Sequence, residues 1–160
     1  MTRKVAIAPV KKSITVNTDP AHAFEIFTSA IDRWWPKSHA IGSSPATAFM
    51  IEPFVGGRWF AKCEDGSEVN NGHVLVWDPP HRFVSSWEIN AQWQPDVAVA
   101  SEVEVRFVAA AKGTTVVELE HRNFERLGDL NGAALRDQLD NGWPGLLELY
   151  RSVANGGAAS

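Results

Sequence analysis

Residues 114–121 read TTVVELEH, with apolar or small side chains at the odd positions and two glutamates at even positions. Residues 103–107 read VEVRF and show the same alternation. Successive side chains of a strand point to opposite faces of a sheet, so both segments are predicted to be half-buried strands. A shift of one residue would turn every apolar side chain toward solvent. The alternation therefore places His121 on the buried face, beside Leu119.

Further short strands are predicted around this pair. They lie at 12–17, 49–52, 58–62, 69–77 and 81–89, and the pair itself extends over 97–109 and 114–123. Turn residues separate them at 55–57, 64–66, 78–80 and 112–113. No helical period interrupts residues 47–123, and turns at this spacing are typical of an antiparallel meander.

Two helices are predicted to flank the strands. Thr18 or Asp19 is the expected N-cap of a short amphipathic helix over about 20–28, with Pro20 in its first turn. Residues 129–131 are expected to cap a second helix, in which Pro144 introduces a kink or a division. Its apolar residues recur every three or four positions: Leu135, Leu139, Trp143, Leu146, Tyr150 and Val153. The fold class is therefore α+β, with a helix covering one face of the sheet.

Composition indicates one soluble domain over residues 1–160, with an ordered core at about 10–154 and flexible ends at 1–8 and 155–160. Hydrophobic residues make up 44% of the chain and charged residues 21%, with a net charge of −4. The largest basic cluster is Lys11-Lys12, so no nucleic-acid partner is expected. No apolar run approaches a membrane span or a signal-peptide core, which predicts a cytoplasmic location without membrane insertion.

A search for catalytic chemistry finds no nucleotide-binding, zinc-protease or nucleophile-elbow motif. The single Cys63 excludes an internal disulfide and is expected to be a buried thiol. No metal, cofactor or catalytic residue is predicted. Glu52 and Arg58 are expected to form an ion pair across a turn or to contact a ligand. His121 is interpreted as a hydrogen-bonded core histidine, a ligand contact or a general base, and the facing of His73 stays open.

The order of several motifs resembles the START-like (SRPBCC, helix-grip) superfamily. They are IEPFVGGRW at 51–59, GHV at 72–74, WDPPHRF at 77–83, the strand at 114–121 and NGWP at 141–144. Within it, residues 12–153 look like the bacterial branch named after the activator of heat-shock ATPase (AHSA type). The resemblance implies a curved antiparallel sheet of six to seven strands around a long C-terminal helix. It also implies two short helices after the first strand and an apolar cavity. Regulation of a chaperone is not expected, because the eukaryotic activator has an additional docking domain.

The leading functional hypothesis is a binding protein for a small apolar or aromatic molecule held between sheet and helix. Seven tryptophans favour such a pocket, and only one of the adjacent Trp34 and Trp35 is expected to point inward. The alternatives are a cyclase- or dehydratase-type enzyme, with His121 or Glu52 moving a proton, and an interaction module such as a homodimer. The expected wall comprises Trp59, Trp87, Val105, Phe107, His121, Trp143, Leu146 and Tyr150, with polar contacts from Glu52, Arg58 and Ser85.

Overall fold

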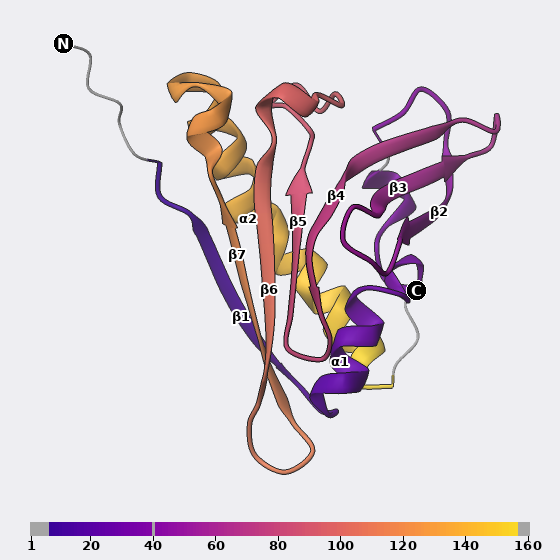
Figure 1. The fold of residues 1–160 in the computed structure, drawn as a ribbon, viewed down its shortest axis with the longest axis vertical. Helices are drawn as coiled ribbons and strands as arrows, with labels where there is room; N and C mark the ends of the chain where they lie inside the picture. The colour runs from indigo at the N-terminus through magenta and orange to yellow at the C-terminus, as the bar shows by residue number, and fades with distance from the viewer. Residues whose placement is uncertain (1–6, 40, 157–160) are drawn as a thin grey trace.

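The computed structural model describes residues 7–39 and 41–156. Seven strands form one antiparallel sheet in the order β1-β7-β6-β5-β4-β3-β2 (Figure 1). Among these residues, the α-helices α1 (Pro20–Phe27) and α2 (Asp129–Ala154) accompany it. The strands are β1 (Val10–Val16), β2 (Ala46–Ile51), β3 (Arg58–Cys63), β4 (Glu68–Asp78), β5 (Arg82–Trp87), β6 (Ser101–Ala109) and β7 (Thr115–Arg122).

This arrangement confirms the predicted α+β helix-grip fold. Figure 1 shows α2 crossing behind β7, β6 and β5, while β4, β3 and β2 curl away at the other end of the sheet. The second short helix expected after β1 consists of two 3-10 turns, η1 (Ile31–Arg33) and η2 (Lys37–His39). The segment 97–99, expected to open a strand, is instead the 3-10 turn η3 (Val97–Val99), and η4 (Phe124–Leu127) precedes α2.

Local sequence explains where both helices begin. Asp19 is the N-cap of α1, and its carboxylate accepts a hydrogen bond from the backbone N–H of His22 at 2.8 Å. Helix α2 begins after Gly128, which has a φ of +86°, so the cap expected from residues 129–131 is replaced by a glycine turn. Pro144 lies inside one undivided helix.

The inner face of the sheet, defined as the face toward α2, holds the core. Val103, Val105 and Phe107 of β6 and Val117 and Leu119 of β7 are all buried in one cluster with the apolar stripe of α2. Their register in the β6–β7 pair brings Val105 opposite Leu119 and Phe107 opposite Val117. The predicted strand faces are therefore confirmed, including the burial of His121, which is fully inaccessible.

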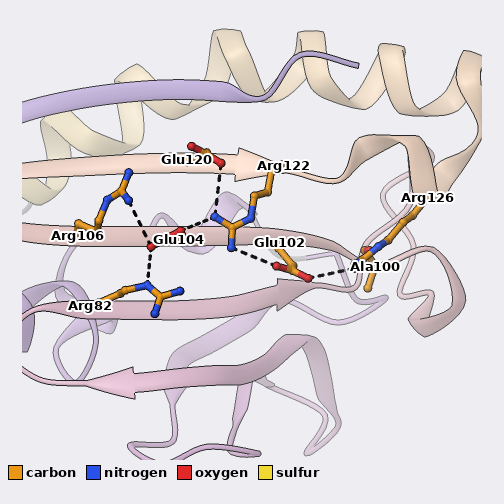
Figure 2. Close-up of polar contacts among 8 residues, drawn as sticks. All are labelled: Arg82, Ala100, Glu102, Glu104, Arg106, Glu120, Arg122 and Arg126. Atoms are coloured by element: carbon orange, nitrogen blue, oxygen red, sulfur yellow. Dashed lines mark hydrogen bonds and ion pairs between the residues drawn. The ribbon is translucent and has the colours of Figure 1, made fainter. Parts of the chain in front are cut away.

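The outer face of the sheet carries an ionic cluster (Figure 2). The Glu104 carboxylate accepts hydrogen bonds from Arg82 Nε at 2.6 Å and from Arg122, and Arg106 Nη1 lies 3.8 Å away. Burial by itself raises the pKa of Glu104, but hydrogen bonds from Arg122 and Arg82 hold that pKa below its ordinary value. The alternation correctly assigned Glu104 to the outer face. The residue is nevertheless only 6% exposed, because the arginines cover its carboxylate.

The predicted flexible ends lie partly outside the described residues. Where described, they contact the rest of the chain: Ile7 packs against the core, and Arg136 Nε donates to the Ala8 carbonyl at 3.2 Å. At the other end, Asn155 accepts a hydrogen bond from the backbone N–H of Asn17 at 2.7 Å. Within the part of the chain that the structure describes, no helix has the length and apolarity needed to cross a membrane.

Candidate functional site

A cavity of about 610 Å³ lies beside α2, at the end of the sheet where β4 and β5 meet the segments 35–39 and 89–93 and Ile41. Its apolar wall consists mainly of buried or half-buried side chains of Trp35, Ile41, Trp87, Ile89, Leu139 and Leu146. Polar groups come from Ser38, His39, Asn71, Gln138 and Asn141. The cavity is therefore apolar over most of its wall and has a small number of hydrogen-bonding groups, as is usual for sites that bind small molecules.

Four indole rings form a continuous cluster against this cavity. Trp35 lies 5.2 Å from Trp59, 5.9 Å from Trp143 and 6.3 Å from Trp87, measured between ring centroids. Most of these contacts are edge-to-face, which aromatic rings prefer to a face-to-face stack. The indole N–H groups of Trp35, Trp59 and Trp87 are buried without a hydrogen-bond acceptor among the described residues.

The burial of both adjacent tryptophans corrects the expectation that only one points inward. Trp34 is 2% exposed and Trp35 is 3% exposed. Trp34 Nε1 donates to the Ile26 carbonyl at 2.9 Å, and its ring packs on Phe27 and Tyr150. Both rings find space because the chain follows a 3-10 turn before them rather than a strand, so consecutive side chains do not point to opposite faces.

A β-bulge brings Asn71 to the cavity. Trp59 pairs with Gly72 and Phe60 pairs with Asn70, so Asn71 has no partner residue across the β3–β4 ladder. The extra residue allows the Asn71 side chain to line the cavity, where the residue is only 4% exposed. This polar group therefore belongs to the buried wall of the cavity rather than to its rim.

Gly72 lets β4 approach β5 closely beside this bulge. A Cβ at position 72 would lie 1.8 Å from the Ser86 carbonyl oxygen, which is far inside van der Waals contact. The backbone N–H of Glu88 donates to the Asn71 carbonyl at 2.6 Å across the same gap. Only glycine fits at position 72 without separating the strands, and the position of Asn71 depends on that fit.

The rim of the cavity is formed by a short loop and by α2. Asn90 Oδ1 accepts hydrogen bonds from the backbone N–H groups of Gln92 and Gln94, each at 3.0 Å, and so folds the loop on itself. Between them, Trp93 adopts a φ of +59°, which is rare for a residue with a large side chain. Trp93 Nε1 donates to Gln138 Oε1 of α2 at 2.6 Å, so one hydrogen bond joins the two sides of the rim.

His39 also lines the cavity, close to the Trp35 ring at 6.3 Å between centroids. The burial of part of its imidazole lowers its pKa from the ordinary value. Near neutral pH the ring is therefore uncharged and carries a lone pair on one nitrogen.

Of the residues predicted to form the wall, Trp87 and Leu146 line this cavity. Tyr150 Oη donates to the Ala23 carbonyl at 2.8 Å and so joins α2 to α1. The other predicted wall residues lie in the adjacent core, each no more than 3% exposed: Trp59, Val105, Phe107, His121 and Trp143.

The three predicted polar contacts do not line the cavity. Arg58 Nε lies 3.4 Å from Glu52 Oε1, so the ion pair expected across the turn is present, and a second pair joins Arg58 to Glu68 at 2.8 Å. Ser85 Oγ donates to the Ser86 carbonyl at 2.8 Å. His73, whose facing was open, binds the Glu88 carboxylate through Nδ1 at 2.7 Å.

His121 is held neutral by its surroundings. Trp143 Nε1 donates to His121 Nδ1 at 3.2 Å, and an indole nitrogen cannot accept, so the ring proton resides on Nε2. That proton is donated to Ser101 Oγ at 2.8 Å. Complete burial lowers the His121 pKa to about 3. Both nitrogens are engaged by protein groups, and this agrees with the reading as a hydrogen-bonded core histidine.

The sequence patterns assign no wall or rim role to His39, Asn71, Trp93 or Gln138, and they do not distinguish Trp35 from Trp34 as an entrance residue. The segments 37–39 and 90–94 have no period from which a side-chain direction can be read. The one available signal was Asn70-Asn71-Gly72 inside a predicted strand, since glycine within a strand often marks a bulge or a close backbone approach.

Known proteins match nearly the whole chain. The anthrahydroquino-γ-pyrone synthase Txn09, whose structure was solved complexed with SUM, is 41% identical over 92% of this chain and 97% of its own, with a TM-score of 0.64. The self-sacrificing resistance protein CalC from Micromonospora echinospora is 28% identical over 95% and 97%, with a TM-score of 0.68.

A protein from Mesorhizobium loti, 17% identical over 93% of this chain and 98% of its own, shares the fold with a TM-score of 0.68. No curated protein sequence matches the chain. Residues 17–149 match the family described as activator of Hsp90 ATPase homolog 1-like protein (AHSA1). The chain therefore belongs to this AHSA-type family and has the START-like helix-grip fold, a fold that binds small ligands.

Proposed function

We propose that the chain binds a planar aromatic molecule in the cavity beside α2. The observation that carries the proposal is a cavity of about 610 Å³ with an apolar wall and few polar groups. Cavities that bind drug-sized molecules commonly measure roughly 300–1,000 Å³ and have this composition.

The aromatic class follows from the tryptophans. Trp35, Trp87 and Trp93 all line the cavity, the first two from the buried wall and the third from the rim. Contacts between aromatic rings contribute about 0.5–1.5 kcal/mol beyond the area they bury, so a flat aromatic ligand gains more here than an aliphatic one. The similarity to a synthase of an anthrahydroquino-γ-pyrone supports a ligand with several fused rings.

A pair of glycines on α2 allows a matched test. Gly142 lines the cavity and a Cβ there meets no atom of the described residues within 4 Å, whereas Gly145 is equally open but does not line it. Gly142→Phe is therefore expected to fill the cavity without disturbing the fold, and Gly145→Phe serves as the control. Native mass spectrometry with a mixture of fused-ring aromatic compounds should detect adducts on the wild type and on Gly145→Phe. Loss of adducts on Gly142→Phe supports the proposal, and equal adducts on all three proteins contradict this site.

A second candidate function is catalysis of a cyclisation within the bound molecule, as the cyclase alternative suggests. The specific observation is the uncharged His39 imidazole at the cavity, where it can accept a proton from a ligand hydroxyl. His39 takes this role rather than His121, whose two nitrogens are occupied. Turnover of a retained ligand that is lost in His39→Gln, with binding unchanged, supports catalysis. Turnover intact in His39→Gln removes this assignment.

A further inference from the structure

We infer that Asn71 selects ligands that carry a ring carbonyl or a phenolic hydroxyl at the buried wall of the cavity. The inference rests on the binding function proposed above and names the class of molecule that the site accepts. It begins from one side chain, because the Asn71 carboxamide is a hydrogen-bonding group that lines the cavity from a residue only 4% exposed.

The Asn71 carboxamide has no hydrogen-bond partner among the described residues, although it offers two N–H donors and a carbonyl acceptor. The other amides of the cavity are engaged. Gln138 Oε1 accepts from Trp93 Nε1 at 2.6 Å, and Asn141 Nδ2 donates to the Asp137 carbonyl at 3.0 Å. The Asn71 carboxamide is not among the fully buried unpaired atoms of the described residues, which are the indole nitrogens of Trp35, Trp59 and Trp87 and Glu88 Oε1. Its polar atoms are therefore accessible from the cavity, where a ligand can supply their hydrogen-bond partner.

The backbone holds this carboxamide in place. The bulge between the Trp59–Gly72 and Phe60–Asn70 pairs fixes the direction of Asn71. The hydrogen bond from the Glu88 N–H to the Asn71 carbonyl, at 2.6 Å, ties the bulge to the residue that follows β5. Groups fixed by the backbone recognise ligands more sharply than mobile surface side chains, because less freedom is lost on binding.

The apolar neighbours of Asn71 favour ligands with an oxygen atom over pure hydrocarbons. Trp87 and Ile89 line the same wall, and both are 2% exposed. A pure hydrocarbon that fills the cavity removes water from the carboxamide and returns no hydrogen bond, which disfavours binding. A ligand with an oxygen atom at that position restores the bond. Sites of this kind reject analogues that lack the hydrogen-bonding group.

Three two-ring probes test the inference: 2-naphthol, 1-tetralone and naphthalene. Isothermal titration calorimetry on the wild-type protein should give affinities about three- to tenfold higher for the two oxygenated probes than for naphthalene. Asn71→Leu keeps a similar volume and removes the amide, so this preference should fall to about one. Asn71→Asp keeps acceptors and removes the N–H donors, so 1-tetralone should lose affinity while 2-naphthol retains it.

Asn70→Leu is the matched control, because Asn70 carries the same amide one residue away and does not line the cavity. An unchanged preference in Asn71→Leu overturns the inference about Asn71 and leaves the binding function standing. Absence of binding by all probes to the wild type, or equal binding to Gly142→Phe, overturns both. Circular dichroism verifies folding, and Asn71→Ala replaces Asn71→Leu if the latter is unfolded.

Discussion

Replacing Gly72 with alanine should destabilise the protein strongly. The added Cβ would lie 1.8 Å from the Ser86 carbonyl oxygen, so β4 and β5 must separate by roughly 1.5 Å before the methyl group fits. That separation breaks or lengthens two hydrogen bonds, from Glu88 N–H to the Asn71 carbonyl at 2.6 Å and from His73 N–H to Ser86 Oγ at 2.8 Å.

The magnitude follows from these two effects. Overpacking costs about 1–3 kcal/mol, and each hydrogen bond contributes about 1 kcal/mol. Together they predict a loss of about 3–5 kcal/mol in the free energy of unfolding, a large part of the total for a domain of this size. In urea, with a slope of about 2–3 kcal/mol per molar, the unfolding midpoint should fall by roughly 1–2.5 M.

Urea unfolding followed by far-UV circular dichroism measures this shift, with Gly145→Ala as the control. A Cβ at Gly145 meets no atom within 4 Å and lies inside α2, so this change should stabilise the protein by up to about 1 kcal/mol. If Gly72→Ala unfolds at the wild-type midpoint, the close approach of β4 to β5 does not constrain position 72. Glycine at position 72 would then not be what holds the Asn71 bulge in place.

Three further predictions concern a buried base, a buried acid and the rim. Because the His121 pKa is about 3 when folded and about 6.5 when unfolded, the unfolded chain binds the extra proton below pH 6.5. The free energy of unfolding should fall by about 2 kcal/mol between pH 6.5 and 5, and His121→Gln should flatten this slope in urea titrations; an equal slope contradicts the assignment. Glu104→Gln should lower the free energy of unfolding by about 1–3 kcal/mol in the same assay at pH 7. The control Glu118→Gln, at a half-exposed residue, should change it by under about 0.5 kcal/mol. Equal effects of the two substitutions would argue against a special role for the ionic cluster in Figure 2. Trp93→Phe removes the donor to Gln138 and should accelerate both binding and release of an aromatic probe about threefold in stopped-flow mixing; unchanged rates would show that this bond does not limit entry.

The elements that could be predicted are those in which apolar residues recur at a regular spacing. Alternation in β6 and β7 fixed which side chains face α2, and the spacing from Leu135 to Val153 located α2, because burial of one face imposes these repeats. The cavity wall instead depends on a bulge at Asn71 and a loop around Trp93. Both are set by contacts between distant segments, which no local pattern records.

Some predictions concern properties that a single folded chain does not report. The homodimer alternative, the cytoplasmic location and the treatment of residues 1–160 as one domain remain predictions from composition and motif order. The ion pair of Glu52 and Arg58 could be predicted, because the two residues are close in sequence and opposite in charge. Longer-range partners, such as Trp93 with Gln138, require the fold first.

The four indoles beside the cavity also give the molecule a built-in optical response. Trp35, Trp59, Trp87 and Trp143 lie close enough for electronic excitation to pass among them before light is emitted. An absorbing guest that touches only Trp35 or Trp87 can therefore quench the emission of all four. The intensity of ultraviolet fluorescence should thus report occupancy of the cavity directly, without any label attached to the protein or to its guest.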